Sequence, residues 1–295
     1  MKLDYKLLHA LSVVIKDQSF ERAAESLCIT QSAVSQRIKQ LEQYFAEPVL
    51  IRRHPIVATE LGKKLLRHYH QVSLLEQELF NELYPQQQQL QTIHIATNAD
   101  SLATWLIPAI APLLKQHMIE VNMLVANEGH TLDRLKDGEA FGAISRQKKA
   151  ATGCVATLLG PQHYILVATQ AFADKYFAQG INANTLKNAP AVAFDQKDNM
   201  HVDYLIEHFG LKEGDYPLHA VRSSEAFVNM AKHGVAYCLI PELQISEELS
   251  NGQLINLLPD KPLIEVLYWH HWILIKGIHK KVSDAIINYG QQVLS

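Results

Sequence analysis

The first eighty residues carry apolar side chains at helical spacing. In residues 4–17 they recur at the three- and four-residue intervals of an amphipathic helix, at Leu7, Leu8, Leu11, Val14 and Ile15. Residues 19–44, SFERAAESLCITQSAVSQRIKQLEQY, predict two short helices joined by a tight turn at Cys28. Ser19 and Thr30 precede these helices, and Ser and Thr side chains cap helix N-termini. The spacing therefore predicts a helix-turn-helix.

The second helix of this pair has two distinct faces when its residues are placed about 100° apart around the axis. An arc of about 60° is apolar and predicts the core-facing stripe: Val34, Ile38, Leu41 and Phe45. A different arc, of about 140°, carries hydroxyl and amide side chains and one cation: Gln31, Ser32, Ser35, Gln36 and Lys39. Such groups hydrogen-bond to base edges in the major groove, so this face predicts a DNA-contacting surface. An ordinary corner between two helices is the alternative, which the hydroxyl and amide face disfavours.

A basic hairpin is predicted directly after the helix-turn-helix. Residues 47–59 place two short apolar strands on either side of Arg52, Arg53 and His54. This is the pattern of a wing, whose basic tip reaches phosphates or a minor groove. A surface cluster of charges is the alternative for the two arginines.

Residues 59–84 predict one long helix. Two series recur in it every seven residues: Leu65, Val72 and Leu79 in one, and Leu61, His68 and Leu75 in the other. This spacing predicts a coiled-coil helix that pairs two copies of the chain. Pro85 and the glutamines at 86–89 end the pattern and predict a polar hinge and a domain boundary.

From residue 92 onward, short apolar runs alternate with helical segments. Strands are predicted at residues 93–97, 121–125, 141–145, 164–169, 191–194, 219–222, 235–240 and 266–272. Helices are predicted at residues 101–114, 131–136, 171–177, 202–208, 225–233 and 280–293. Such alternation predicts an α/β fold with mostly parallel strands.

Polar residues stand where several of these strands end and helices begin: Asn98, Asp100, Ser101, Ser145, Asp195, Asp198, Ser223 and Glu225. Ligands of open α/β sheets bind at the carboxyl ends of the strands. Hydroxyl and N–H groups at a helix start suit a carboxylate, and carboxylates suit a cation. The set therefore predicts a site for a zwitterion with an additional positive charge. For each acidic residue taken alone, stabilising a helix start is the alternative role.

The charge distribution adds to the DNA-binding interpretation. The net charge is −3, but residues 1–67 carry +4 and the remainder carries −7, which favours nucleic-acid binding by one end. The chain start lacks the apolar core of a signal peptide, and no apolar run approaches 18 residues, so we expect a cytoplasmic protein without a membrane partner. Cys28, Cys154 and Cys238 are widely spaced, which favours reduced thiols over a Cys154–Cys238 redox pair.

Enzyme chemistry has little support in the sequence. It contains no glycine-rich phosphate loop, no nucleophile elbow and no His or Cys spacing typical of a metal site. His270 and His271 are adjacent on a predicted strand and point to opposite faces. We therefore predict no catalytic residue, no metal and no cofactor. A solute-binding protein is the remaining alternative for the α/β part, and the N-terminal winged segment disfavours it.

These motifs carry a family resemblance. The stretch FERAAESLCITQSAVSQRIKQLEQYFAEPVLIRR, followed by TELG at residues 59–62, resembles the DNA-binding domain of LysR-type transcriptional regulators. The resemblance implies a multi-domain fold with an all-α winged helix-turn-helix domain at 1–59, a linker and dimerisation helix at 60–90, and an α/β effector domain at 91–295. That domain is expected to be two-lobed and periplasmic-binding-protein-like, with lobe I at 91–163 and 268–295 and lobe II at 164–267.

Several effector-domain segments are similar to a narrower group, the regulators of amino-acid export that respond to arginine and lysine, also described as inhibitors of chromosome initiation. The segments are NADSLATWLIPA, FADKYF, PAVAFD, SSEAFV and LYWH. This resemblance implies lysine or arginine as the small-molecule effector between the lobes, and a different metabolite is the alternative. The family also implies a homodimer or homotetramer on double-stranded promoter DNA, in contact with RNA polymerase.

The resemblance assigns roles to two sets of DNA-binding residues. The candidates for base-edge contacts are Gln31, Ser32, Ser35 and Gln36. The candidates for phosphate contacts, which position the protein without specifying sequence, are Thr30, Arg37, Lys39, Arg52 and Arg53. The wing tip IRRHP at residues 51–55 is less proline-rich than the family pattern, so operator preference is expected to differ.

Overall fold

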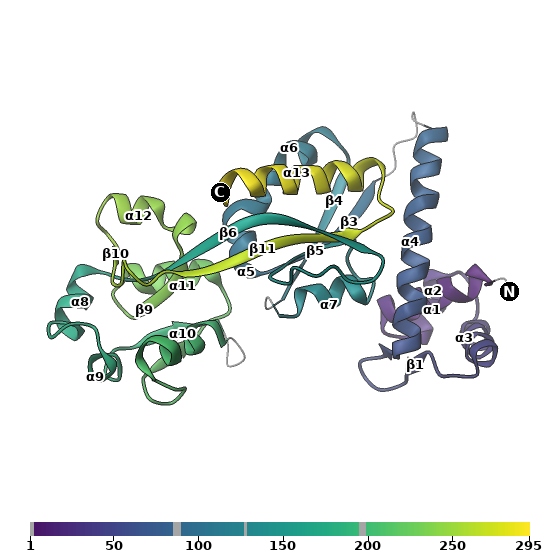
Figure 1. Ribbon diagram of the computed structural model, residues 1–295. Helices are drawn as coiled ribbons and strands as arrows, with labels where there is room; N and C mark the ends of the chain where they lie inside the picture. Colours follow the sequence, from purple (N-terminus) through teal and green to yellow (C-terminus); the bar gives the residue numbers. More distant parts are fainter. Residues whose placement is uncertain (1–2, 85–89, 127–128, 195–198) are drawn as a thin grey trace.

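The computed structural model describes residues 3–84, 90–126, 129–194 and 199–295. It contains a helical N-terminal part, one long helix, and an elongated α/β part that carries the C-terminus (Figure 1). The predicted hinge at 85–89 and two candidate effector residues, Asp195 and Asp198, lie outside the described residues.

The N-terminal part is the predicted winged helix-turn-helix, with α1 (Tyr5–Asp17), α2 (Phe20–Ser26), α3 (Gln31–Phe45), β1 (Leu50–Ile51) and β2 (Val57–Ala58). The side chains of Asp4, Ser19 and Thr30 accept hydrogen bonds from backbone N–H groups in the first turns of the three helices. Apolar residues of all three helices share one core, which includes Leu11, Ala23, Val34 and Ile38. The apolar stripe predicted on α3 is therefore confirmed.

Helix α4 (Glu60–Leu83) begins against the wing. The Thr59 hydroxyl accepts from the Gly62 N–H at 3.1 Å and donates to the Pro48 carbonyl at 2.8 Å. The first part of the predicted seven-residue pattern packs within the chain, because Leu65 is buried in the winged-domain core and His68 hydrogen-bonds to a tyrosine of α1. At the end of the pattern, Leu79 is 54% exposed.

The far end of α4 contacts the effector domain. Glu78 is 8% exposed and lies against the start of α13 (Gly277–Val293), where a Cβ on Gly277 would meet the Glu78 carboxylate. Burial raises the pKa of Glu78 and lowers the pKa of His279 to about 4. The His279 ring, 3.8 Å from the carboxylate, is therefore neutral near pH 7 and forms no ion pair with it.

The α/β part contains one sheet in the order β4-β3-β5-β11-β6-β9-β7-β8, with β10 paired to β6. Its strands are β3 (Gln91–Thr97), β4 (Ile119–Val125), β5 (Gly142–Ser145), β6 (Cys154–Ala168), β7 (Ala191–Ala193), β8 (Leu218–Ala220), β9 (Tyr237–Pro241), β10 (Ile255–Asn256) and β11 (Leu263–Trp272). The prediction of mostly parallel strands is wrong. β3, β4 and β5 are parallel, as are β7, β8 and β9, but the long strands β6 and β11 run antiparallel to each other and to their outer neighbours β9 and β5.

The helices of the α/β part flank this sheet. They are α5 (Ala99–Ser101), α6 (Ile107–Gln116), α7 (Thr131–Lys136), α8 (Gln170–Tyr176), α9 (Ala183–Leu186), α10 (Asn199–Phe209), α11 (Ser224–Lys232), α12 (Ser246–Ser250) and α13. A π-helical segment, Leu102–Leu106, joins α5 to α6, and a 3-10 turn, Glu242–Gln244, follows β9. The predicted helix at 101–114 is helical throughout, across the π-helical segment and through both Pro108 and Pro112 of α6.

Two apolar bodies lie at the ends of this sheet, joined by β6 and β11 (Figure 1). Lobe I contains a core around Ile95, Trp105 and Trp269, whereas lobe II packs around Tyr164, Tyr204 and Tyr237 on one sheet face and Val167 and Ile240 on the other. Cys154 and Cys238 are buried in different clusters, which leaves the alternative of a redox pair without structural support. Among the described helices, none is long and apolar enough to cross a membrane.

Candidate functional site

The hydroxyl and amide face of α3 is exposed. This face comprises Gln31, Ser32, Ser35, Gln36 and Lys39, all of them exposed, while Arg37 is half-buried. The Thr30 hydroxyl accepts from the Ala33 N–H at 3.2 Å and lies 2.9 Å from the Ser32 hydroxyl, so it orders the first turn of the helix. These exposed residues therefore form a continuous polar surface on α3, on a different side of the helix from the buried stripe.

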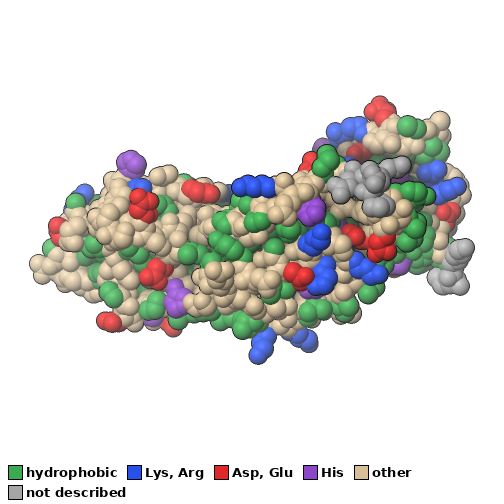
Figure 2. All heavy atoms as spheres, turned by 90° about the horizontal axis from the view of Figure 1, so that it is seen from above, with side chains coloured by type: hydrophobic (Ala, Val, Ile, Leu, Met, Phe, Trp, Pro, Cys, Tyr) green, Lys and Arg blue, Asp and Glu red, His purple; other side chains and the backbone are tan. Residues whose placement is uncertain are grey.

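The wing arginines have different surroundings. Arg52 Nη2 lies 3.3 Å from Glu42 Oε2 of α3, and its guanidinium carbon lies 5.9 Å from the centre of the Phe20 ring. Arg53 and His54 are exposed. Arg52 is thus held against α3, while Arg53 is an exposed cation of the wing. In Figure 2, Lys and Arg side chains are more frequent toward the winged-domain end than at the lobe II end.

A cavity of about 320 Å³ lies between the lobes. Lobe I contributes Asn98, Ala99, Asp100, Ala126, Gly129, His130 and Arg146, and lobe II contributes Phe194, Met200, His201, Asp203, Tyr204, Glu207, Phe227 and Leu239, while Tyr164, Leu263 and Glu265 come from β6 and β11. The volume lies at the lower end of the ~300–1,000 Å³ range of small-molecule sites.

Asp100 connects the two walls of this cavity. Its Oδ1 accepts from the Ser224 hydroxyl of lobe II at 2.6 Å, and its Oδ2 accepts from the Tyr164 hydroxyl at 2.8 Å. The Tyr164 oxygen in turn accepts from Gln162 Nε2 at 3.0 Å. Asp100 follows β3 and Ser224 starts α11, so this carboxylate links lobe I to lobe II.

Carboxylates outnumber cations on the cavity wall. Among the described lining residues, Asp100, Asp203, Glu207 and Glu265 stand against the single guanidinium of Arg146. Arg146 Nη1 lies 2.7 Å from Glu265 Oε1, so the pair neutralises itself at one side. The remaining carboxylates give the cavity an excess of negative charge, which favours a cationic ligand.

His201 is a buried polar side chain on the same wall. It is 2% exposed, neither ring nitrogen has a hydrogen-bond partner within the described part of the chain, and its ring lies between those of Tyr216 and Tyr237, with centres 5.8 and 5.6 Å away. Burial lowers the pKa of His201 to about 4, so the ring is neutral near pH 7. His201 therefore adds no positive charge to the cavity.

Comparison with known proteins identifies the family of this architecture. The family described as "Bacterial regulatory helix-turn-helix protein, lysR family" matches residues 5–63, and the "LysR substrate binding domain" matches residues 86–272. The chain belongs to the LysR family. It is a transcriptional regulator with a DNA-binding and an effector-binding part, and not an enzyme.

Individual LysR-type proteins resemble it over the full length. The HTH-type transcriptional regulator ArgP of Aeromonas salmonicida is 56% identical over 293 residues, which cover 99% of this chain and 98% of that protein. The crystal structure of ArgP from Mycobacterium tuberculosis has a TM-score of 0.87 at 31% identity and covers 98% of both chains. The full-length regulator LysG from Corynebacterium glutamicum, with bound effector Arg, has a TM-score of 0.82 at 29% identity and covers 98% of this chain and 99% of that one.

The structure brings together part of the effector set predicted for this LysR-family chain. Asn98 and Asp100 line the cavity, and the Asn98 side chain also caps α5 by accepting from the Ser101 N–H. The other described candidates are not lining residues. Ser101 is buried, Ser145 is buried and accepts from the Gln147 N–H, and Ser223 caps α11 while donating to Glu225, which is exposed.

Several residues of this site are not among the candidates predicted from the sequence. Ser224, one position from the predicted Ser223, supplies the contact to Asp100. Asp203 and Glu207 are four residues apart on a predicted helix, which places both carboxylates on one face and was an available signal. Glu265 carried no such signal, because its strand was predicted to begin at residue 266. Arg146 directly follows the predicted strand at 141–145.

No group of three or more His, Cys, Asp or Glu side chains within the described ranges is arranged to hold a metal ion. His68 and His70 of α4 have hydrogen-bond partners in α1.

Proposed function

We propose that this regulator binds operator DNA by inserting α3 into the major groove. Gln31, Ser32, Ser35 and Gln36 contact base edges or the adjacent backbone, and Thr30, Arg37, Lys39, Arg52 and Arg53 contact phosphates. The exposed polar face of α3, backed by a fully packed core, supports this assignment. Four uncharged side chains make few base-specific contacts, so DNA shape and half-site spacing supply much of the specificity.

The effector in this proposal is a cationic amino acid, arginine or lysine. The observation that carries it is the excess of carboxylates in the cavity between the lobes. Arg146 receives the effector carboxylate, while Asp100, Asp203 and Glu207 surround its amino and side-chain cations. A solved relative, LysG, has arginine as its bound effector, and ArgP of M. tuberculosis shares the full-length fold.

Calorimetry on the full chain tests the effector. We expect heat of binding with arginine or lysine and none with citrulline, which has the shape of arginine without its side-chain charge. Glu207→Gln removes one charge-assisted contact and should weaken binding by about 10- to 100-fold, corresponding to ~1.5–3 kcal/mol. Glu213→Gln is the matched control, since Glu213 is exposed in the same lobe but is not a lining residue. If neither amino acid gives heat of binding, the chain is a LysR-type regulator that responds to a different metabolite.

The assembly in this proposal is a homodimer or homotetramer paired through α4, which reads an inverted repeat and contacts RNA polymerase. Exposed apolar side chains near the end of α4 support the pairing: Leu79, Phe80, Leu83 and Tyr84. The domains would be 1–59, 60–90 and 91–295, with lobe I at 91–163 and 268–295 and lobe II at 164–267. Separate apolar cores in the winged part and in each lobe support this division.

A further inference from the structure

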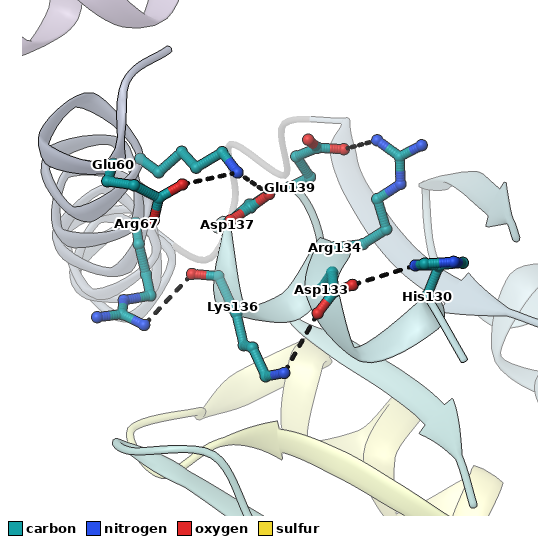
Figure 3. Close-up of polar contacts among 9 residues, drawn as sticks. Glu60, Arg67, His130, Asp133, Arg134, Lys136, Asp137 and Glu139 are labelled. Atoms are coloured by element: carbon teal, nitrogen blue, oxygen red, sulfur yellow. Dashed lines mark hydrogen bonds and ion pairs between the residues drawn. The ribbon is translucent and has the colours of Figure 1, made fainter. Parts of the chain in front are cut away.

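The linker helix α4 lies against the turn that follows α7 (Figure 3). Lys63 Nζ is 3.0 Å from Asp137 Oδ2, and Arg67 Nη1 donates to the Lys136 carbonyl at 3.3 Å. The hydrogen bond from Lys63 to Asp137 raises the pKa of Lys63. Lys63 and Arg67 are four residues apart and therefore lie on one face of α4, and this face contacts the turn.

His70 extends the same face and joins three parts of the molecule. Its Nδ1 lies 2.7 Å from the Gly138 carbonyl, which only accepts, so Nδ1 carries the proton. Its Nε2 then accepts from the hydroxyl of Ser12 in α1, at 3.2 Å. Burial lowers the pKa of His70, which favours this neutral ring. One imidazole therefore connects the winged domain, the linker helix and lobe I.

Gly138 makes the approach of turn and helix possible. Its φ is +79°, and a Cβ there would lie 2.5 Å from the Arg67 Cα and 2.9 Å from the Arg67 Cβ. Any side chain at this position would therefore push α4 away from the turn. Gly153, also in lobe I, has φ +78° but nothing within 4 Å of its Cβ position, so it shares the backbone conformation without the contact.

The other end of α7 lies at the effector cavity. Gly129 and His130 line the cavity and directly precede the helix. The Thr131 hydroxyl donates to the Ile144 carbonyl of β5 at 2.6 Å, and Leu132 and Leu135 are buried in the lobe I core. A six-residue helix is about 9 Å long, so this anchored segment spans the distance from cavity wall to linker helix.

A line of charged contacts runs along the same segment (Figure 3). His130 Nδ1 lies 3.4 Å from Asp133 Oδ2, and Asp133 Oδ1 lies 3.2 Å from the Lys136 ammonium. The backbone carbonyl of Lys136 is the acceptor of Arg67. A charged ligand beside His130 thus acts on the same segment that holds α4.

We propose that the turn at 136–138 is a latch that fixes α4 to lobe I, and that α7 couples occupancy of the effector cavity to its closing. This inference rests on the effector role proposed above. One end of α7 lies at the effector cavity and the other end at the contact with α4. A ligand that favours one placement of α7 therefore shifts the equilibrium between the closed and the open latch. By linkage, opening the latch changes effector affinity by the same factor.

Gly138→Ala in the full chain tests the latch, with Gly153→Ala as the matched control for the positive φ. Lys63→Met is a second variant, which removes the ion pair with Asp137, and that with Glu60, without a backbone change. Lys232→Met is its control, because Lys232 is a half-buried lysine that pairs with Glu248 at 3.0 Å in lobe II, outside α4 and α7. Each variant is measured by DNase footprinting with and without arginine, by calorimetry with arginine, and by hydrogen exchange of residues 63–70 and 136–139.

We expect arginine to alter the footprint of the parent chain and of both controls. In Gly138→Ala and Lys63→Met, DNA binding persists but the ratio of operator affinities with and without arginine, expected at about 5 or more, falls toward 1. The latch proposal is wrong if operator affinity in both latch variants depends on arginine as strongly as in the parent chain. It is also wrong if the parent chain binds arginine but its footprint does not change. If calorimetry shows no arginine binding, the proposed effector fails. Hydrogen exchange of residues 63–70 and 136–139 then tests the latch by itself. The latch requires this exchange to be faster in Gly138→Ala than in Gly153→Ala.

Discussion

At the scale of single residues, His201 places a titratable ring in a dry environment. The folded chain keeps this ring neutral down to pH about 4, whereas an exposed histidine titrates near 6.5. Unfolding therefore takes up a proton between these values. The contribution of His201 to stability is full above pH 6.5 and is lost as the pH falls toward 4, by about 3 kcal/mol in total.

The pH dependence of urea unfolding checks this. We expect His201→Phe to flatten the fall in unfolding free energy between pH 6.5 and 4 relative to the parent chain. His219→Gln, at an exposed position, should leave the slope unchanged. An identical slope in parent and His201→Phe would mean that the ring is not the group that resists protonation.

Gln31 carries the most direct prediction for DNA. Replacing it by alanine should cost about 1–3 kcal/mol at the cognate operator if its amide makes a bidentate base contact, and much less on random DNA. Gln40→Ala is the control, since residue 40 lies about 180° from residue 31 around the helix. Gel-shift titrations on both DNAs decide the assignment, and an equal loss on random DNA would reassign Gln31 to the backbone.

The sequence predicts which surfaces are polar better than it predicts which side chains contact one another in the cavity. The cap Thr30 and the exposed face of α3 follow from helical spacing and are found as predicted. At the start of α11, by contrast, the sequence predicts contacts from Ser223 and Glu225, while Ser224 reaches Asp100. Which of three consecutive polar side chains turns inward depends on where the other lobe stands, and local sequence does not encode that distance.

At the scale of elements, Thr59 joins α4 to the wing. Its hydroxyl caps the helix and also satisfies the Pro48 carbonyl. Thr59→Ala should lower the unfolding free energy of the winged domain by about 1 kcal/mol, because cap removal typically costs ~0.5–2 kcal/mol. Calorimetric unfolding measures this, with Thr59→Ser expected to retain most of the stability. Equal destabilisation by serine would assign the effect to the lost methyl group instead.

Local periodicity identified most helices but not the long antiparallel strands. The first ten of the fifteen residues of β6, from Cys154 to residue 163, mix polar and apolar types because the two faces of the strand meet different surroundings, and no strand is predicted there. β6 and β11 pair over ten residues of β11 across a bulge at Leu267 and Tyr268. This pairing joins segments about one hundred residues apart, which explains why a pattern of parallel units was inferred instead.

At the scale of the whole molecule, the end of α4 is the main candidate for self-association. Phe80 is 62% exposed and Leu83 is 60% exposed. Phe80→Glu places a charge in this apolar surface and should shift the chain toward monomer in sedimentation equilibrium, since burying an unpaired charge is costly. Gln77→Glu adds the same charge at an exposed polar position and is the matched control. An unchanged mass distribution in Phe80→Glu would place the dimer contact elsewhere.

The two docking points on α4 also make it a lever. Glu78 rests on lobe I 18 residues from the start of the helix at Glu60, a span of about 27 Å. If the contact between α4 and the turn at 136–138 is lost and the helix pivots at Glu78, a tilt of about 7° displaces the N-terminal end of α4 by about 3 Å. That is close to the ~3.4 Å that separates successive base pairs. A movement too small to rearrange the effector domain would therefore suffice to move a recognition helix by one step along the operator.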